Sequence, residues 1–249
     1  MIKAGYWLGE FGWELMTWVP YLRRLARDNE ILVGCEESHW PLYEDFATKA
    51  EFCDGNVSAK NMWYHDGGEV SGIKGGIAPS KEICHSKERE YIKYGRKIQA
   101  YENLVVVHAR ATKNMRTGYR NWPDERWEAV CGAISAKGFD VWSIGTAGGA
   151  RCVKGTYDMR GLSLGYVMNI LASAKACIGP SSGPMHLASL CGCPHLVWTD
   201  DQKQVVGCTN RDRYEKLWNP FDTPVRVIDS GWQPEIQHVI DEFELLICR

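Results

Sequence analysis

Residues 179–184 read Gly-Pro-Ser-Ser-Gly-Pro and lie between an apolar run and a helical pattern that ends at Gly192. Proline at the first helical position and glycine just past the last one are typical of a real helix. The backbone N–H groups and the positive dipole end at a helix start bind anions, and phosphate above all. Ser181 and Ser182 add hydroxyl donors there, so the pattern fits either a phosphate-binding turn with Gly183 or serines that only cap the helix.

A second group of side chains that could bind phosphate follows an apolar, buried-type strand over residues 104–108. The loop over residues 108–123 carries four cations, namely Arg110, Lys113, Arg116 and Arg120. Arginine and lysine hold phosphoryl oxygens through charge-assisted hydrogen bonds. A solvated, flexible run of charge is the other interpretation. We favour a clamp, because few acidic residues interleave with these cations, and the sequence then predicts a pocket for a diphosphate.

Transfer of a group from a diphosphate to a hydroxyl also needs a base, and the loop after the first strand offers two carboxylates. Glu14 opens a helical pattern, where the helix dipole favours its ionised form. Acidic residues are common in any first helical turn, so this position alone does not prove a role. We predict Glu14 as the base, with Glu10 as the rival.

Several known site types are missing from the sequence. It contains no Walker A motif, no G-x-G-x-x-G after the first strand and no G-x-S-x-G elbow. No paired-carboxylate metal signature such as D-x-D stands at a strand end; Asp200-Asp201 is the nearest approach to one, and it suits a turn or cap equally well. Cys191-Gly-Cys193 lacks a second pair at zinc spacing. We therefore expect a metal-independent site with no cofactor.

Composition sets wider bounds. The chain has 249 residues, a net charge of −2 and 24% charged residues, so nothing global demands nucleic acid or an acidic membrane as partner. Its ten cysteines are scattered through apolar segments, and no signal peptide precedes the first strand, which favours reduced thiols and a cytoplasmic protein. No apolar run approaches the roughly 20 residues that span a bilayer.

Strand-like and helix-like segments alternate along most of the chain. This alternation predicts an α/β fold with a doubly wound parallel sheet, in which ligands bind at the carboxyl ends of the strands. The expected strands cover residues 2–8, 31–35, 62–64, 104–108, 139–144, 176–178, 195–198 and 225–228. The expected helices cover residues 14–28, 42–50, 80–100, 123–136, 164–173, 185–190 and 233–247, with residues 199–220 as a loop. We place a domain break near residue 100.

The motifs resemble those of the heptosyltransferase-like glycosyltransferases, the lipopolysaccharide heptosyltransferase family. Residues 179–194 are similar to that family's donor motif, G-x-D-S/T-G-x-x-H-L-A-A-A-L-G-x-P, with Ser181 in place of the aspartate. Residues 120–127, Arg-Asn-Trp-Pro-Asp-Glu-Arg-Trp, resemble its K-x-W-P-x-E-x-W segment. Residues 160–164 resemble the turn before the donor motif, and residues 12–23 resemble its N-terminal G-D-x-L segment, with Glu14 at the catalytic aspartate.

The resemblance implies a GT-B fold of two Rossmann-like domains that face each other across a cleft. We expect an N-terminal acceptor-side domain over residues 1–100 and a donor domain over residues 101–232. The helix over residues 233–249 should cross back to the first domain. The implied donor-binding residues are His108, Arg110, Lys113, Arg116, Arg120, Gly145, Thr146, Ser181, Ser182, Gly183 and His186.

The implied activity is inverting, metal-independent transfer from a nucleotide-diphosphate sugar to an acceptor hydroxyl. The acceptor is a glycan or lipopolysaccharide in one interpretation and a hydroxylated DNA base in another. In the DNA case the basic segment Lys81–Lys97 would face the duplex, although a solvated helix face is the simpler interpretation. A non-catalytic nucleotide-sugar or glycan-binding protein on the same fold is the alternative. The sugar and the oligomeric state stay open.

Overall fold

The structure, a computed structural model, describes residues 1–49, 76–112, 118–202 and 207–248. It contains two compact units, Met1–Ile92 and Lys93–Arg249. The boundary lies earlier in the chain than residue 100, where we expected it. The reason is that residues 94–98 attach to the second unit: Tyr94 N–H donates to the Leu190 carbonyl (3.1 Å), and Ile98 N–H donates to Ser173 Oγ (2.8 Å).

The second unit is built on a six-stranded sheet with the order β6-β5-β4-β7-β8-β9, in which all neighbouring strands run parallel. Its strands are β4 (Leu104–Val107), β5 (Asp140–Ser143), β6 (Tyr157–Asp158), β7 (Ala176–Pro180), β8 (His195–Trp198) and β9 (Val225–Ile228). All residues of β4, β7 and β8 are buried. Continuous apolar runs are typical of inner parallel strands that are covered on both faces. The predicted doubly wound sheet is confirmed.

The order of the strands reverses between β4 and β7. From β4 the chain passes to β5 and then to β6 on one side, and it returns to place β7 on the other side of β4. Such a reversal leaves a crevice at the carboxyl ends of the two central strands, and open α/β sheets bind their ligands there. The residues that follow β4 and β7 are His108 and Ser181. The topology therefore brings both predicted phosphate-binding segments to one edge of one sheet.

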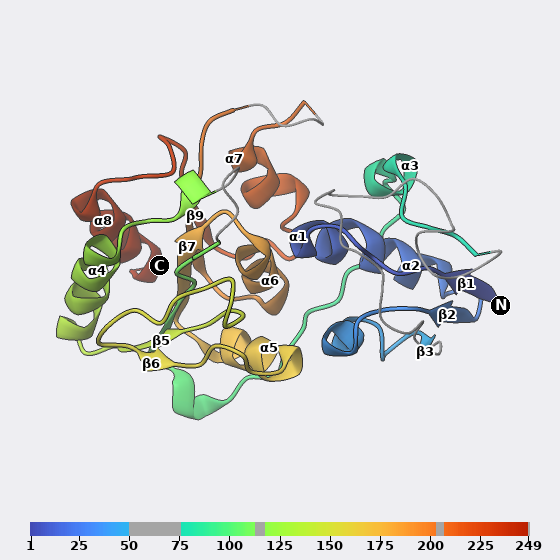
Figure 1. Cartoon of the computed structure of the whole chain (residues 1–249), viewed down its shortest axis with the longest axis horizontal. Helices are drawn as coiled ribbons and strands as arrows, with labels where there is room; N and C mark the ends of the chain where they lie inside the picture. The colour runs from blue at the N-terminus through green and yellow to red at the C-terminus, as the bar shows by residue number, and fades with distance from the viewer. Residues whose placement is uncertain (50–75, 113–117, 203–206, 249) are drawn as a thin grey trace. The chain divides into compact units, whose positions relative to one another are not determined.

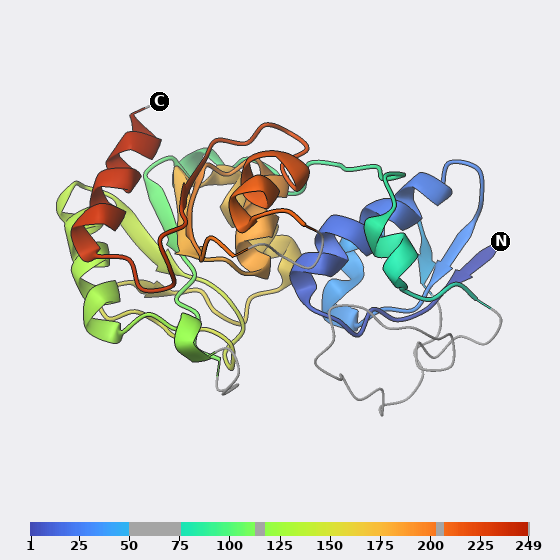
Figure 2. The ribbon, with the colours of Figure 1, turned by 90° about the horizontal axis from the view of Figure 1, so that it is seen from above.

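Helices cover the two faces of this sheet (Figures 1 and 2). They are α4 (Asp124–Ala136) and α8 (Ile236–Ile247) on one face and α5 (Leu164–Ser173) and α6 (Gly183–Cys191) on the other. The first face holds a large apolar core that includes three tryptophans in mutual ring contact, with centroid distances of 5.0–5.3 Å: Trp122, Trp127 and Trp198. Segment 199–220, expected to be a loop, contains α7 (Asn210–Asp212) and a π-helical turn, Arg213–Leu217.

The last helix, α8, lies in the segment 233–249 that we expected to cross back to the first domain. Its buried side chains, Val239, Phe243 and Leu246, join the core of the second unit. Phe243 packs edge-on against Phe139, with ring centroids 5.9 Å apart. The apolar stripe of α8 covers β8 and β9, so this helix packs within the second unit, and a crossing to the first domain stays a prediction.

The first unit has a small parallel sheet of order β1-β2-β3, formed by Ile2–Ala4, Ile31–Val33 and Thr48–Lys49. Ile77 extends this sheet beside β1, since its N–H donates to the Lys3 carbonyl over 2.8 Å. One continuous helical segment follows β1. It consists of α1 (Phe11–Trp13), a π-helical stretch (Glu14–Trp18) and α2 (Val19–Leu25).

Two predicted helices of the first unit are wrong. Residues 42–50 do not form one, because Pro41 lies inside a 3₁₀ helix over Glu37–Leu42 and the chain then turns into β3. Residues 80–100 yield only α3 (Lys81–His85) and a later 3₁₀ turn, Gln99–Tyr101. The basic run therefore does not form a helix face. The expected strand over residues 62–64 lies outside the described residues.

Candidate active site

The turn between β7 and α6 is the centre of the predicted donor site. Ser182 is the N-cap residue of α6, with extended backbone angles (φ −166°, ψ 168°), yet its side chain makes no capping hydrogen bond. Its Oγ is buried and has no hydrogen-bond partner in the part of the chain that the structure describes. The interpretation that the serines only cap the helix is therefore wrong for Ser182. A buried hydroxyl without a partner costs free energy unless a ligand or water satisfies it.

Tyr214, from the π-helical turn after α7, holds this turn in place. Its phenol donates to Ser181 Oγ over 3.1 Å and accepts the Ser182 N–H over 3.3 Å. Burial raises the pKa of Tyr214, so the phenol stays neutral and donates. The Ser181 N–H also donates to the Trp198 carbonyl of β8 over 2.9 Å. The turn is therefore fixed from both neighbouring elements.

His186 lies in the first turn of α6 and contacts Tyr214, the side chain that bonds both serines. Its ring stacks on Tyr214 with centroids 4.4 Å apart and planes at 11°, and its edge contacts Trp218. Burial, reinforced by the charge of Arg213, lowers the pKa of His186 well below its ordinary value. The imidazole is therefore neutral, and its contacts make it a support for the turn.

His108 directly follows β4 and is also buried. Burial lowers its pKa to about 4, and Nδ1 lies 3.3 Å from the Ile144 carbonyl. Two glycines make room for it. A Cβ on Gly145 would come within 3.0 Å of His108 Nδ1, and one on Gly179 would come within 3.1 Å of the His108 carbonyl. The predicted donor residues His108 and Gly145 thus pack against each other at the strand ends.

Hydrogen bonds connect the loop after β4 to the turn that contains Asn121. Arg110 donates to Asn121 Oδ1 over 3.2 Å, and Asn121 Nδ2 donates to the Thr112 carbonyl over 2.9 Å. Thr146 is exposed, and its Oγ1 accepts the Gly149 N–H over 3.1 Å, which closes a local turn. Lys113 and Arg116 lie outside the described residues.

Arg120 is stacked on an aromatic side chain that the sequence analysis did not select. Its guanidinium lies 4.4 Å from the ring centroid of Trp232 and 5.6 Å from that of Tyr119. Trp232 Nε1 in turn donates to Asp200 Oδ2 over 2.9 Å, and Asn210 donates to the other oxygen of Asp200. Asp200 thus ties two loops together, which agrees with the turn interpretation of the acidic pair.

In the first unit, Glu14 begins the π-helical stretch and is 1% exposed. Among the described residues, Oε1 accepts a hydrogen bond, whereas the buried Oε2 has an ion-pair neighbour but no hydrogen bond. Tyr43 Oη donates to Oε1 over 2.6 Å, and His39 Nδ1 lies 2.8 Å from Oε2 as an ion pair. Glu10, the rival base, is exposed and precedes α1 as its N-cap residue.

The helix that carries Glu14 contains Pro20, which has no N–H to donate to the carbonyl four residues earlier. That carbonyl, on Met16, instead accepts a hydrogen bond from Tyr91 Oη over 2.9 Å. The Glu90 N–H donates to the Pro20 carbonyl over 2.9 Å. π-Helical turns are frequent at functional sites, and this one is stabilised from outside the helix at two points.

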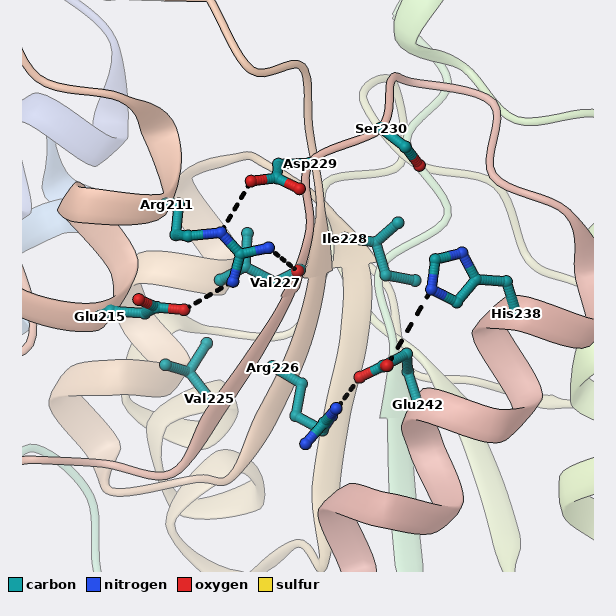
Figure 3. Close-up of a pocket in the computed structure, with 10 residues that line it drawn as sticks. All are labelled: Arg211, Glu215, Val225, Arg226, Val227, Ile228, Asp229, Ser230, His238 and Glu242. Carbon is teal, nitrogen blue, oxygen red and sulfur yellow. Dashed lines mark hydrogen bonds and ion pairs between the residues drawn. The ribbon is translucent and has the colours of Figure 1, made fainter.

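A hollow of about 310 Å³ lies at the edge strand β9, away from these residues (Figure 3). Its charges pair with one another: Arg211 contacts Asp229 (2.7 Å) and Glu215 (2.8 Å), and Arg226 pairs with Glu242. None of the predicted site residues lines it. Charged side chains of this kind protect a sheet edge from further pairing.

Within residues 1–49, 76–112, 118–202 and 207–248, no group of three or more His, Cys, Asp or Glu side chains could hold a metal ion. No helix there has both the length and the apolar character that crossing a membrane requires. The cysteines of those residues are unpaired thiols, and most are buried.

Residues 78–197, just under half of the chain, match the family model of Glycosyltransferase family 9 (heptosyltransferase). No curated protein matches the sequence. Among solved structures, the chain is similar to E. coli ADP-heptose LPS heptosyltransferase II (TM-score 0.64, 13% identity, 100% of this chain and 99% of that one).

E. coli heptosyltransferase WaaC with ADP-2-deoxy-2-fluoro heptose is also similar (TM-score 0.60, 13% identity, 98% of this chain and 99% of that one). The chain is also similar to the iron-containing dodecameric glycosyltransferase TibC from enterotoxigenic E. coli H10407 (TM-score 0.58, 13% identity, 98% of this chain and 76% of that one). The fold is that of the GT-B class, as the motifs predicted. The structural similarity thus shows the fold, and the family model adds a likeness to heptosyltransferases over residues 78–197.

Of the predicted donor residues, His108 and Ser181 directly follow the two strands at the reversal, whereas the predicted bases Glu14 and Glu10 belong to the first unit. Sequence reasoning missed four side chains that hold the predicted ones: Tyr214, Trp232, His39 and Tyr43. Tyr214 and Trp232 lie in or just after a segment with no clear periodicity. His39 and Tyr43 flank Trp40-Pro41, and nothing in their spacing links them to Glu14.

Proposed function

We propose that this protein moves a sugar from a nucleotide-diphosphate donor to an acceptor hydroxyl with inversion, and that the β7–α6 turn binds the diphosphate. The observation that carries the proposal is Ser182 Oγ, which is buried, without a partner and at the N-terminus of a nine-residue helix. A phosphate oxygen would satisfy this hydroxyl and would lie at the positive dipole end of the helix.

Two further facts support a nucleotide-sugar donor. The turn lies where the strand order reverses, which is the ligand crevice of open α/β sheets. The WaaC structure similar to this chain contains ADP-2-deoxy-2-fluoro heptose. ADP-heptose is therefore the first donor to test.

The leaving diphosphate gains negative charge as the sugar departs, so fixed donors and cations at that point lower the barrier. We assign this role to the Ser181–Gly183 turn together with Arg110 and Arg120, and we add Lys113 and Arg116 on the sequence pattern alone. The proposed reaction uses no metal, since these donors supply the positive potential. Addition of EDTA tests this point, because it should leave transfer unchanged.

The acceptor that we propose is a glycan, and the reaction is placed in the cytoplasm. The DNA alternative relied on a basic helix over Lys81–Lys97, and that helix does not form beyond His85. Duplex binding that falls steeply with salt would revive it.

A thermal-shift series with ADP, UDP, TDP and their sugars tests the donor site, because a ligand of the folded state raises its apparent stability. We expect ADP-heptose to raise the melting temperature of the wild-type protein and to do so far less for Ser182→Ala. No shift with any nucleotide would overturn the donor assignment. Binding without release of the nucleoside diphosphate, over a panel of glycan acceptors, would instead favour a non-catalytic nucleotide-sugar-binding protein.

A further inference from the structure

The environment of Glu14 raises a difficulty for direct proton transfer to its carboxylate. The side chain is 1% exposed, Oε1 accepts from Tyr43 Oη and Oε2 faces His39 Nδ1. A general base must come within hydrogen-bond distance of the proton that it removes. Oε1 is bonded by Tyr43, and Oε2 is buried against the His39 ring without a hydrogen bond, so an acceptor hydroxyl would have to displace one of these side chains.

His39 meets the requirement that Glu14 does not. It lies in the 3₁₀ helix Glu37–Leu42, and its side chain is 26% exposed. Its Nδ1 is turned to Glu14 Oε2 at 2.8 Å, and the ring contacts Phe11 with centroids 5.1 Å apart. Nε2 has no hydrogen-bond partner among the described residues. The geometry therefore holds one ring nitrogen against a buried carboxylate and leaves the other available.

We propose that His39 is the catalytic base of the transfer reaction and that Glu14 is a positioning residue that orients it. This inference rests on the proposed function. With the proton on Nδ1, beside the Glu14 carboxylate, the lone pair of Nε2 accepts the proton of the acceptor hydroxyl. The acceptor oxygen forms a bond to the anomeric carbon, and the bond from that carbon to the diphosphate oxygen breaks. The nucleoside diphosphate leaves with the electron pair, and the imidazolium later gives its proton to water.

The charges around His39 agree with this role. Burial opposes protonation of the ring, but the Glu14 carboxylate outweighs it with a smaller contribution from Glu36, so the pKa of His39 is raised. Glu37 is paired with Lys49. The nearby Cys35 thiol stays neutral, because burial raises its pKa to about 12. Glu14 therefore dominates the field at the ring and fixes the tautomer in which Nε2 is the acceptor.

A simple structural role makes a different prediction. If His39 only neutralises the buried carboxylate, then His39→Gln, which keeps a donor for Glu14, should affect stability and leave turnover nearly unchanged. If His39 is the base, the same variant retains donor binding and loses turnover. His85→Gln, at an exposed histidine in α3, is the matched control and should behave as the wild type.

The experiment measures ADP release from ADP-heptose with water as acceptor, and ADP-heptose affinity, between pH 5 and pH 9. We expect His39→Gln to lower kcat by ~100-fold or more with unchanged affinity, and imidazole to restore part of the activity of His39→Ala. We expect Glu14→Gln to lower kcat by ~10- to 100-fold. The acid limb of its pH profile should move down by ~1 pH unit, because the carboxylate that favours the charged ring is gone.

Two results would overturn the inference while the proposed function stands: turnover of His39→Gln within about threefold of the wild type, or an acid limb that Glu14→Gln leaves in place. A wild-type protein that neither binds nor turns over ADP-heptose would instead reject the proposed donor reaction itself, and His39 with it.

Discussion

Tyr214 donates a hydrogen bond from its phenol to Ser181 Oγ over 3.1 Å, and this contact joins the π-helical turn after α7 to the turn after β7. The phenol oxygen of Tyr214 also accepts the Ser182 N–H. We expect Tyr214→Phe to keep the stacking on His186, to cost about 1 kcal/mol of folding free energy and to weaken ADP-heptose binding several-fold. Urea unfolding and calorimetric titration check both effects, with Tyr166→Phe on exposed α5 as the control. Unchanged affinity would show that the turn needs no such support.

Ser182→Ala separates ligand binding from helix capping. Because the hydroxyl makes no cap bond, its removal should change the free energy of unfolding by less than about 0.5 kcal/mol. A hydroxyl that bonds a charged phosphate contributes roughly 1.5–3 kcal/mol, so ADP-heptose should bind about 10- to 100-fold more weakly. Ser163→Ala is the matched control, since Ser163 is the N-cap of α5 and also lacks a side-chain cap bond. Equal affinities of the two variants would remove Ser182 from the site.

Arg120→Ala should reduce ADP-heptose affinity about tenfold, because the stacked guanidinium is pre-oriented on Trp232 and supplies a charge-assisted bond. Arg120→Lys keeps the charge and loses the planar stacking, so we expect an intermediate affinity. Titration at two salt concentrations checks the result, with exposed Lys97→Ala as the control. If Arg120→Ala binds as tightly as Lys97→Ala, the residue lies outside the donor site.

Acid should destabilise the second unit through its buried histidines. Burial lowers the pKa values of His108 and His195 to about 4. The unfolded chain, with a pKa near 6.5, therefore binds more protons as the pH falls from about 6.5 to 4. The free energy of unfolding has its full value above about pH 6.5. At about pH 4, each histidine should have lowered it by up to about 3 kcal/mol. His195→Met should flatten the decline seen by urea unfolding, whereas exposed His85→Gln should leave it unaltered.

The tryptophan cluster should dominate the stability of the same unit. The indole N–H groups of Trp122, Trp127 and Trp198 are buried without hydrogen-bond partners among the described residues, so these rings contribute through packing alone. Trp127→Ala should cost about 3–5 kcal/mol. Trp127→Phe should cost clearly less, because it keeps an aromatic contact and removes an orphan donor. Equal losses for the two variants would contradict this account.

The second unit was largely predictable because its signals are local. The apolar run of β4, Ser163 before α5, and Pro184 and Gly192 around α6 each specify an element through backbone chemistry. Gly192 adopts the left-handed conformation (φ 72°) that ends α6. Helix 164–173 and strands 195–198 and 225–228 agree with the expected bounds.

The errors have physical causes as well. Segment 86–98 is rich in helix-forming residues, but its chain is held by tertiary hydrogen bonds, such as Ile98 N–H to Ser173 Oγ, and these outweigh propensity. The side chains that contact the predicted residues could not be identified from the sequence either. His39 lies 25 positions from Glu14 and Tyr214 lies 33 from Ser181, so only the folded chain brings each pair together.

The two hydrogen bonds that Glu90 and Tyr91 make to the carbonyls of Pro20 and Met16 have a consequence for dissecting the chain. The final residues of the first unit serve as a brace for the helix on which Glu14 sits. A fragment cut before residue 90 would lose both of these hydrogen bonds to the helix. Any excised first unit must therefore extend through Ile92 to hold Glu14 as the full chain does.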